Sequence, residues 1–419
     1  MGIFARLENR GVIPPKISES VRNTIRNMNL QGFSALQKYS REFDWFELSK
    51  ENIRVTPEEI ESRVLLLTEK QKESIDFSFE QVFEFQKKVA QTIQPITSTT
   101  RYGTTSLIPK PMERVGIYTP GGLAALPSSL MMAGVCARAA GVKELIVCTP
   151  PRREGLNPAI AYLVKKLGIK EVYLLGGIAA IWFMANGLER ISKPVDKICG
   201  PGNVYVSEAK SQLAQAGKVG IDLIAGPSEV LIIADESANA CFVAADLLAQ
   251  AEHGVNSSAI LVTNSKELAV AVKEEVKKQL ETKQKKKEIA LEQCGGIFVV
   301  SNLEEGVKLA NEFGPEHLEI LCKGSTREKL LETQLCAGAI FIDTGEAFAD
   351  YGMTGGNHIL PTGGSVRFSS GLSARDFFVW QYVEQLSKEA QKELAERTAT
   401  FADLENLEAH SDAARIRKR

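Results

Sequence analysis

The chain has 419 residues, of which 44% are hydrophobic, 24% are charged and 7% are aromatic. This length exceeds one simple hydrophobic core, so we expect two or more domains in an ordinary globular protein. The 50 lysines and arginines nearly balance the 52 aspartates and glutamates, for a net charge of −2. No overall field therefore favours nucleic acid or an anionic membrane as a partner.

Targeting and redox features of the sequence point to a cytoplasmic protein. The stretch MGIFARLENRGVIPPK lacks the apolar core of a signal peptide, and Arg6 stands where myristoylation needs a small hydroxyl residue. No run approaches the roughly 18 apolar residues of a membrane span. The cysteines are odd in number, never spaced CxxC and mostly set in apolar runs: Cys136, Cys148, Cys199, Cys241, Cys294, Cys322 and Cys336. This pattern predicts a reducing setting and argues against a cysteine-held zinc.

The first hundred residues are predicted to be mostly helical. Residues 1–20 are expected to form an arm, because Pro14-Pro15 disfavours a helix there. Apolar residues at helical intervals predict a helix over about 19–42. At Thr56-Pro57-Glu58-Glu59, an N-cap, a proline at the first helical position and a capping-box glutamate predict a helical segment running towards about 92.

From Arg114 onward, short apolar runs alternate with helical segments. The first series is RVGIY, ELIVCTP, EVYLLGG and KICGPG, and the second, after Ala225, is EVLIIAD, AILVT, GIFVV, LEILC and AIFID. This alternation predicts two α/β units with parallel sheets, joined near 225, which together form a cleft. No G-x-G-x-x-G follows any of these strands, so an ordinary dinucleotide fingerprint is absent. After about 371 the chain is predicted to be helical again, with too little apolar surface for an independent core.

The run AADLLAQAEHG holds the first candidate ligands. Its apolar residues have helical spacing and Gly254 is placed to end the helix. Gln250 and His253, three residues apart, share one face, and Asp246 lies one turn earlier. An imidazole beside an amide oxygen can hold one side of a metal. The alternative is a partly buried histidine bonded to its own helix.

The four histidines of the chain all stand beside polar or loop residues rather than inside apolar runs. They are His253 in QAEHG, His317 in GPEHLE, His358 in GGNHILPT and His410 in LEAHSDAA. With cysteine excluded, His253 with Gln250, His317, His410 and Asp350 are candidate ligands of a zinc site with an open position. Glu316 and His317 diverge on a loop and are candidates for two separate acid–base groups.

Two glycine-rich turns each follow a short strand, Tyr118-Thr-Pro-Gly-Gly122 and Cys199-Gly-Pro-Gly-Asn203. Turns of this kind expose backbone N–H groups that hold phosphate oxygens. Tight turns without a ligand are the alternative for each of them.

Seven motifs, in this order and spacing, closely resemble histidinol dehydrogenase: RVGIYTPGGLAALPSS, DKICGPGNVYV, GIDLIAGPSEVLIIAD, AADLLAQAEHG, GPEHLE, DYGMTGGNHILPT and LEAHSDAARIR. The resemblance spans essentially the whole chain and is strongest from 113 to 360. It implies an enzyme of histidine biosynthesis that oxidises L-histidinol to L-histidine through the aldehyde, consuming two NAD⁺. It also implies one zinc per subunit and a homodimer of intertwined subunits.

The resemblance assigns roles residue by residue. The zinc ligands would be Gln250, His253, Asp350 and His410. His317 would take the hydroxyl proton in the first step, and Glu316 would activate the water that adds to the aldehyde. Substrate contacts would come from Ser228, His358 and Glu405 together with His317 and the zinc ligands, and NAD contacts from Tyr118 and Asn203.

The implied architecture is two incomplete Rossmann-like domains with parallel sheets, plus small extended and helical tail segments involved in dimerisation. Residues 1–20 would be an arm that joins the tail. Residues 21–112 with 226–371 would form a discontinuous catalytic domain, residues 113–225 the NAD domain, and residues 372–419 a helical tail packing on the partner subunit. His410 on that tail would then complete a site in the other subunit.

The sequence departs from the family pattern at three places. Ala179 replaces the glutamine that usually contacts NAD, which removes a hydrogen bond contributing on the order of 1 kcal/mol. Asp350 lies eight residues before His358, where the family has seven, and the chain ends nine residues after His410. These departures admit a paralogue that oxidises another small polar alcohol, such as a sulfonated or amino diol, by the same four-electron chemistry.

Two hypotheses from other classes remain. One is a zinc hydrolase in which Glu316 activates water without a nucleotide, and the formation of NADH would exclude it. The other is a metal- or nucleotide-binding protein that has lost turnover. Its marker would be a broken Glu-His pair or missing ligands, and both sets are intact here.

Overall fold

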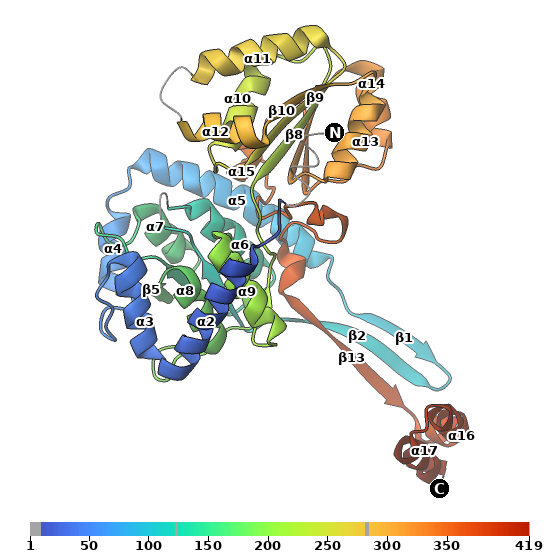
Figure 1. Cartoon of the computed structure of the whole chain (residues 1–419). Coiled ribbons are helices and arrows are strands. Elements are labelled where there is room, and N and C mark those ends of the chain that lie inside the picture. The colour runs from blue at the N-terminus through green and yellow to red at the C-terminus, as the bar shows by residue number, and fades with distance from the viewer. Residues whose placement is uncertain (1–9, 122–124, 281–284, 419) are drawn as a thin grey trace.

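The computed structural model describes residues 10–121, 125–280 and 285–418. Two α/β units lie one above the other, and a long arm extends away from them to the C-terminus (Figure 1). The strands of the described residues form three sheets, with orders β5-β4-β3-β6-β7, β10-β9-β8-β11-β12 and β1-β2-β13. The first two are parallel and the third is antiparallel, so the predicted α/β fold with two parallel sheets is confirmed.

The first sheet forms the core of the lower unit. Its strands are β3 (Arg114–Tyr118), β4 (Glu144–Thr149), β5 (Glu171–Leu174), β6 (Lys197–Cys199) and β7 (Gly220–Ile221). The connecting helices are α6 (Pro127–Ala139), α7 (Pro158–Lys166), α8 (Gly177–Asn186) and α9 (Val204–Gln215). Every residue of β3 is buried, because helices cover both faces of the sheet, and this is why its strands are continuous apolar runs.

The second sheet lies in the upper unit. Its strands are β8 (Glu229–Ala234), β9 (Ser258–Thr263), β10 (Gly296–Val299), β11 (His317–Leu321) and β12 (Ala339–Ile342). Its helices are α10 (Ala240–Ala251), α11 (Lys266–Leu280), α12 (Lys285–Cys294), α13 (Leu303–Phe313), α14 (Gly324–Glu332) and α15 (Ala347–Asp350). The central strands β8 and β9 are wholly buried, whereas the edge strands β10 and β12 alternate in exposure. Each of the nine short apolar runs identified in the sequence thus contains a strand of one of the two parallel sheets.

The N-terminal helices pack on the first sheet. They are α2 (Pro15–Gln31), α3 (Phe33–Tyr39), a π-helical turn (Ser40–Asp44), α4 (Pro57–Val64) and α5 (Glu69–Gln91). Val21 and Met28 share a core cluster with Tyr118, and Val82 shares another with Val115. By packing, these helices group with residues 113–225, whereas the sequence had assigned residues 21–112 to the unit of 226–371.

Helix boundaries differ from the predictions at three places. Helix α2 begins at Pro15, inside the stretch expected to be an arm, because proline is accepted at the first helical position. The helix predicted over 19–42 is interrupted at Gly32, whose φ is 53°. The long helix towards 92 is broken before Glu69, where Thr68 and Gln71 form a complete capping box, while Thr56 accepts only the N–H of Glu59.

The arm contains a strand that the sequence analysis missed. Strand β13 (Phe378–Leu386) pairs antiparallel with β2 (Gly103–Pro111), which pairs with β1 (Ile96–Thr100). The prediction of helix directly after 371 was wrong here, because FVWQYVEQL is rich in aromatic and β-branched residues that favour strands. Helices α16 (Lys388–Leu404) and α17 (Glu408–Arg415) follow as predicted, at the end of the arm (Figure 1). Short 3₁₀ turns lie at Ser365–Arg367, Ala374–Phe377 and Ile416–Lys418.

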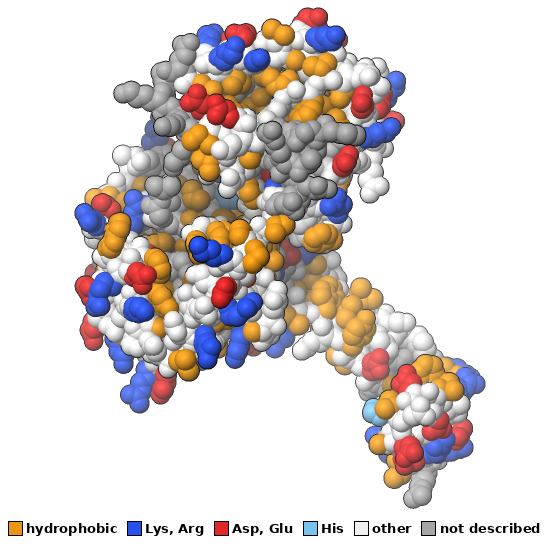
Figure 2. Space-filling model, viewed as in Figure 1, with side chains coloured by type: hydrophobic (Ala, Val, Ile, Leu, Met, Phe, Trp, Pro, Cys, Tyr) orange, Lys and Arg blue, Asp and Glu red, His pale blue; other side chains and the backbone are white. Residues whose placement is uncertain are grey.

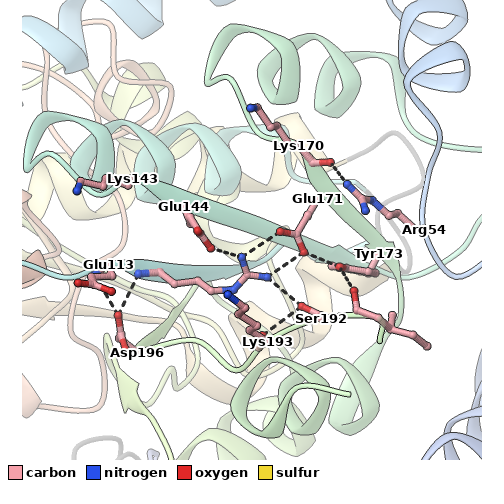
Figure 3. Close-up of polar contacts among 12 residues, drawn as sticks. Arg54, Glu113, Lys143, Glu144, Lys170, Glu171, Tyr173, Ser192, Lys193 and Asp196 are labelled. Carbon is pink, nitrogen blue, oxygen red and sulfur yellow. Dashed lines mark hydrogen bonds and ion pairs between the residues drawn. The ribbon is translucent and has the colours of Figure 1, made fainter. Parts of the chain in front are cut away.

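A buried guanidinium ties together the amino ends of the first sheet (Figure 3). Arg114, at the start of β3, donates to Glu144 at 2.5 Å, to both carboxylate oxygens of Glu171 at 3.0 and 2.8 Å, and to Ser192 Oγ at 3.0 Å. Although burial opposes it, bonding to Arg114 holds the pKa of Glu171 below its ordinary value. Charge-assisted bonds thus join β3, β4 and β5 at their amino ends, opposite to the carboxyl ends where the glycine turns lie.

All seven cysteines are free thiols. None of the helices in the described ranges is long and apolar enough to cross a membrane.

Candidate functional site

Several of the predicted site residues lie at the amino ends of the strands of the second sheet. His317 is the first residue of β11, and Ser228 directly precedes β8. Helix α10 runs antiparallel to the strands it connects, so its last turn, with Gln250, reaches this same edge before the chain enters β9. The site therefore lies outside the amino ends of these strands, whereas parallel sheets generally bind ligands at their carboxyl ends.

Glu316 is a buried carboxyl with an abnormally high proton affinity. Its side chain is only 8% exposed, and burial raises its pKa to about 8, against the lowering effect of the neighbouring His317. The backbone N–H of Glu229, the first residue of β8, donates to Oε2 of Glu316 at 3.1 Å. A carboxyl in such a position exchanges protons near neutral pH, as a general acid or base must.

His317 is enclosed by carboxylates. Its Nδ1 lies 2.9 Å from Oε2 of Glu346, and its Nε2 lies 3.6 Å from Oδ1 of Asp350. Burial alone would lower the pKa of the imidazole, but the charges of Glu316, Glu346 and Asp350 outweigh it and raise the pKa to about 10. The ring also contacts Phe341, with centroids 5.6 Å apart.

Gln250 lies on the far side of Glu346. With its amide nitrogen towards Glu346, it donates to both carboxylate oxygens at 2.8 and 3.1 Å, and its oxygen accepts from the N–H of Glu229 at 2.6 Å. A half turn of the amide would bring its oxygen to the carboxylate side, where a cation would be needed to offset the two facing acceptors. The fully buried Gln250 is therefore able to serve as an oxygen ligand.

Asp350 and His358 meet in spite of the extra residue between them. Nδ1 of His358 lies 2.5 Å from the carbonyl oxygen of Asp350, which only accepts, so Nδ1 carries the proton and donates. Burial lowers the pKa of His358, so the ring is neutral and its Nε2 is an acceptor. Gly352 and Gly355, at φ of 68° and 88°, turn the connecting loop where it packs on α5.

His253 lies just beyond the end of α10 and is exposed. It is near enough to Glu346 and His358 to contribute to lowering the pKa of both groups. The imidazole therefore stands at the mouth of the same cluster. Ser228 is half-buried at the start of β8, where its carbonyl accepts the N–H of Ser258 at 2.9 Å.

Two predicted site residues lie elsewhere. His410 is on α17 and Glu405 ends α16, both exposed, at the far end of the arm from α10 (Figure 1). Within one chain, the described residues contain no group of three His, Cys, Asp or Glu side chains arranged to hold a metal ion. The ligand set predicted from the sequence is thus not assembled by a single copy of the chain.

The two glycine turns lie at the carboxyl edge of the first sheet. Tyr118 ends β3, and its hydroxyl oxygen accepts the N–H of Gly177 at 3.2 Å, while burial raises its pKa to about 12. Asn203 caps α9, since its side-chain oxygen accepts the N–H groups of Tyr205 and Val206 at 3.1 Å each. Gly122 of the first turn lies outside the described residues.

The second glycine turn is fixed by an internal ion pair. Gly200, at φ of 111°, approaches β3 so closely that an added Cβ would lie 2.1 Å from the carbonyl oxygen of Tyr118. Its N–H donates to Oδ2 of Asp222 at 2.7 Å, and the buried Lys210 binds both Asp222 and the carbonyl of Gly200. Asp222 lies six residues before Ser228, so one short segment connects the two candidate sites.

Sequence reasoning missed Glu229, Glu346 and Asp44. Glu346 lies four residues before Asp350, and that helical spacing was the available signal. Glu229 stands in a strand, where a buried carboxylate is not expected, and Asp44 approaches Gly176 only through tertiary packing. Ala179, at the place of the family's glutamine, is buried in α8 as part of the core.

Comparisons with known proteins agree on one family. A family model described as histidinol dehydrogenase matches residues 9–418. The histidinol dehydrogenase of Caldanaerobacter subterraneus subsp. tengcongensis is 40% identical over 100% of this chain and 96% of its own length. That of Geobacillus kaustophilus is 42% identical over 95% of this chain and 93% of its own length. The crystal structure of histidinol dehydrogenase from Elizabethkingia anophelis matches with a TM-score of 0.87 at 35% identity, over 99% of this chain and 95% of that one.

An NAD-dependent aldehyde dehydrogenase from Sinorhizobium meliloti is similar in fold alone. Its TM-score is 0.50 at 14% identity, over 88% of this chain and 87% of that one.

Proposed function

Since the chain belongs to the histidinol dehydrogenase family, the NAD-dependent oxidoreductases of the last step of histidine biosynthesis, we propose how its residues divide that reaction between them. The observation that carries the proposal is the pair of adjacent, buried groups at the start of β11. Glu316 and His317 point into one cluster with Asp350, yet they have different partners. Two groups with separate surroundings suit two successive proton transfers.

His317 acts in the oxidation of the alcohol. Its Nε2 lies 3.6 Å from Oδ1 of Asp350. A zinc ion held by Asp350 would offset the carboxylates that raise the pKa of His317 and leave the ring neutral. Nε2 would then take the hydroxyl proton of L-histidinol as hydride leaves the carbon. Glu316 acts in the oxidation of the aldehyde. Held by the N–H of Glu229, its ionised carboxylate takes a proton from the water that adds to the aldehyde. The resulting hydrate then loses the second hydride.

The donor set Gln250, His253, Asp350 and His410 fits zinc. It offers one amide oxygen, one carboxylate and two imidazoles, which are ligands that a catalytic zinc accepts. Bound there, one zinc per subunit would hold the substrate and polarise the oxygen that develops charge. Ser228, His358 and Glu405 would contact the substrate, His358 through its neutral, accepting Nε2.

NAD⁺ accepts the hydride in each step, and the two glycine turns would bind it. Asn203 uses its side-chain oxygen as the cap of α9, so its amide nitrogen is the group that donates to the cofactor. The capped amino end of α9 and the neighbouring turn present N–H groups suited to phosphate oxygens. Tyr118 would contribute from the end of β3.

A homodimer would complete the site. Along the arm, Tyr382, Phe401 and Leu404 are 75%, 66% and 77% exposed, and hydrophobic side chains gather where the arm leaves the body (Figure 2). Exposed apolar area of this kind marks a protein–protein contact. A partner subunit would cover it and bring His410 and Glu405 to the cluster. We also place the enzyme in the cytoplasm, where seven free cysteines stay reduced.

The test is to count NADH formed per L-histidinol, with metal analysis of the same preparation. Two NADH per substrate and one zinc per chain are expected. One NADH per substrate would leave the aldehyde as product and overturn the role of Glu316. Another alcohol oxidised far faster than L-histidinol would identify the chain as a paralogue within the family.

A further inference from the structure

The carboxylate of Glu346 lies against the ring of His317. Oε2 of Glu346 is 2.9 Å from Nδ1, and the two side chains are only 1% and 5% exposed. In this state the contact does not have the geometry of a hydrogen bond. Catalytic hydrogen bonds are often poorly aligned before the substrate binds and tighten in the complex.

Glu346 is itself fixed from two sides. Its backbone N–H donates to Oε1 of Glu319 at 2.9 Å, and Glu319 lies on the same face of β11 as His317, two residues further along. The fully buried amide of Gln250 packs against the same carboxylate, 2.8 and 3.1 Å from its two oxygens. The residue also begins the short turn that carries Asp350, whose N–H donates to the carbonyl of Glu346 at 3.0 Å.

The other ring nitrogen of His317 points elsewhere. Nε2 lies 3.6 Å from Oδ1 of Asp350, one of the proposed zinc ligands. A carboxylate accepts and never donates, so a neutral ring beside Glu346 carries its proton on Nδ1 and presents a bare Nε2. The second nitrogen is then ready to take a proton, which is the role required of it.

We propose that Glu346 is a positioning residue that holds His317 in the tautomer and orientation needed to take the hydroxyl proton. This inference rests on the proposed role of His317. When Nε2 takes the proton, the ring becomes a cation, and the charge of Glu346 stabilises it where it forms. A carboxylate that orients a catalytic imidazole through Nδ1 is known from unrelated enzymes that share only the geometry.

The experiment compares Glu346→Gln, Glu346→Ala and Glu346→Asp with the unaltered dimer. Each is assayed with the alcohol and, separately, with the aldehyde as the starting substrate. Glu346→Gln removes the charge and lets an amide donate to Nδ1, so kcat for the alcohol should fall roughly 10- to 100-fold. KM for the alcohol should stay within about twofold, and the aldehyde step should fall much less. Glu346→Asp should recover part of the loss, and Glu346→Ala should not.

Asp235→Asn is the matched control, since Asp235 is a buried carboxylate at the opposite edge of the same sheet. It should leave both steps unchanged per folded dimer. Zinc content is measured in every preparation. Loss of zinc in Glu346→Gln equal to that in Asp350→Ala would make Glu346 a ligand and overturn the proposal. Equal losses in both steps, or none, would also overturn it.

His317→Asn separates this inference from the function it rests on. If that variant keeps alcohol oxidation, the assigned base is wrong and the function proposal fails with it. If His317→Asn loses the alcohol step while Glu346→Gln keeps it, only the positioning role fails.

Discussion

The backbone N–H of Glu229 lies 3.1 Å from Oε2 of Glu316, so the first residue of β8 supplies a donor to a carboxyl at the start of β11. The ionised form of Glu316 gains from this bond, yet burial dominates and raises its pKa to about 8. The group is therefore mostly protonated at pH 7 unless a nearby positive charge is added.

This pKa predicts an alkaline dependence for the aldehyde step. The base form of Glu316 increases as pH rises, so the rate should rise with pH and level off above the pKa. A dication on the neighbouring ligands lowers the midpoint, which should thus lie at or below about 8 in the zinc-loaded enzyme. Single-turnover rates from the aldehyde between pH 5.5 and about 9.5 check this. Persistence of the same limb in Glu316→Gln would assign it to another group.

The distance of His410 from α10 predicts complementation between inactive chains. His253→Ala and His410→Ala should each be inactive as homodimers. In a mixed dimer, the intact body of one chain meets the intact tail of the other, which restores one site of two. Equal mixtures refolded together should therefore recover about a quarter of wild-type activity, since half of the dimers are mixed. A mixture that stays inactive would show that each chain builds its site alone.

Asp44 predicts a particular pH dependence of stability. Burial raises its pKa from 3.8 to about 6, against the bond from Gly176. A carboxyl with a raised folded-state pKa binds its proton more tightly in the folded state, so folding becomes less stable as pH rises from about 4 to 6. Asp44→Asn should relieve this cost at pH 7, by about 1 kcal/mol after discounting for solvent screening.

Thermal unfolding at fixed protein concentration, from pH 4 to 7, measures this effect. The slope between pH 4 and 6 should flatten in Asp44→Asn. Glu47→Gln, a change at an exposed neighbour, should not raise stability at pH 7. An unchanged slope in Asp44→Asn would mean that this carboxyl is already solvated in the native state.

Arg114 predicts a stability effect without a catalytic one. Arg114→Met leaves the carboxylates of Glu144 and Glu171 without their cation and should lower the free energy of unfolding by about 2 kcal/mol. Arg190→Met is the control, since Arg190 is 91% exposed and its ion pair should contribute less than about 1 kcal/mol. Urea unfolding measures both, and kcat per folded dimer should match the wild type. Equal effects of the two changes would contradict the buried role of Arg114.

The sequence predicted the sheets well, because buried parallel strands are continuous apolar runs and no other element resembles them at that length. RVGIY and EVLIIAD were both identified in this way. Strand β13 was missed because its residues alternate in no clear pattern and nearly all are exposed. Its pairing with β2 spans more than 250 residues of sequence, which local propensity does not detect.

The site was predictable only as far as its motifs extend. Glu316 and His317 are adjacent in sequence, so their proximity needed no fold. Glu346 contacts His317 because the chain after β12 folds back towards β11. No periodicity in the sequence predicts that path. The grouping of α2–α5 with the first sheet likewise depends on side-chain packing between distant segments, which composition does not specify.

The segment from Asp222 to Ser228 directly connects the second glycine turn to the cluster around Glu316. Asp222 accepts the N–H of Gly200 at one end, and Ser228 directly precedes β8 at the other. Six residues span at most about 21 Å when fully extended, so there is little slack to absorb movement. If a bound nucleotide displaced the Gly200 turn by a few ångströms, the segment would also displace the backbone of Glu229. Binding and release of each NAD would then move the backbone at Glu229, which donates to the carboxyl of Glu316.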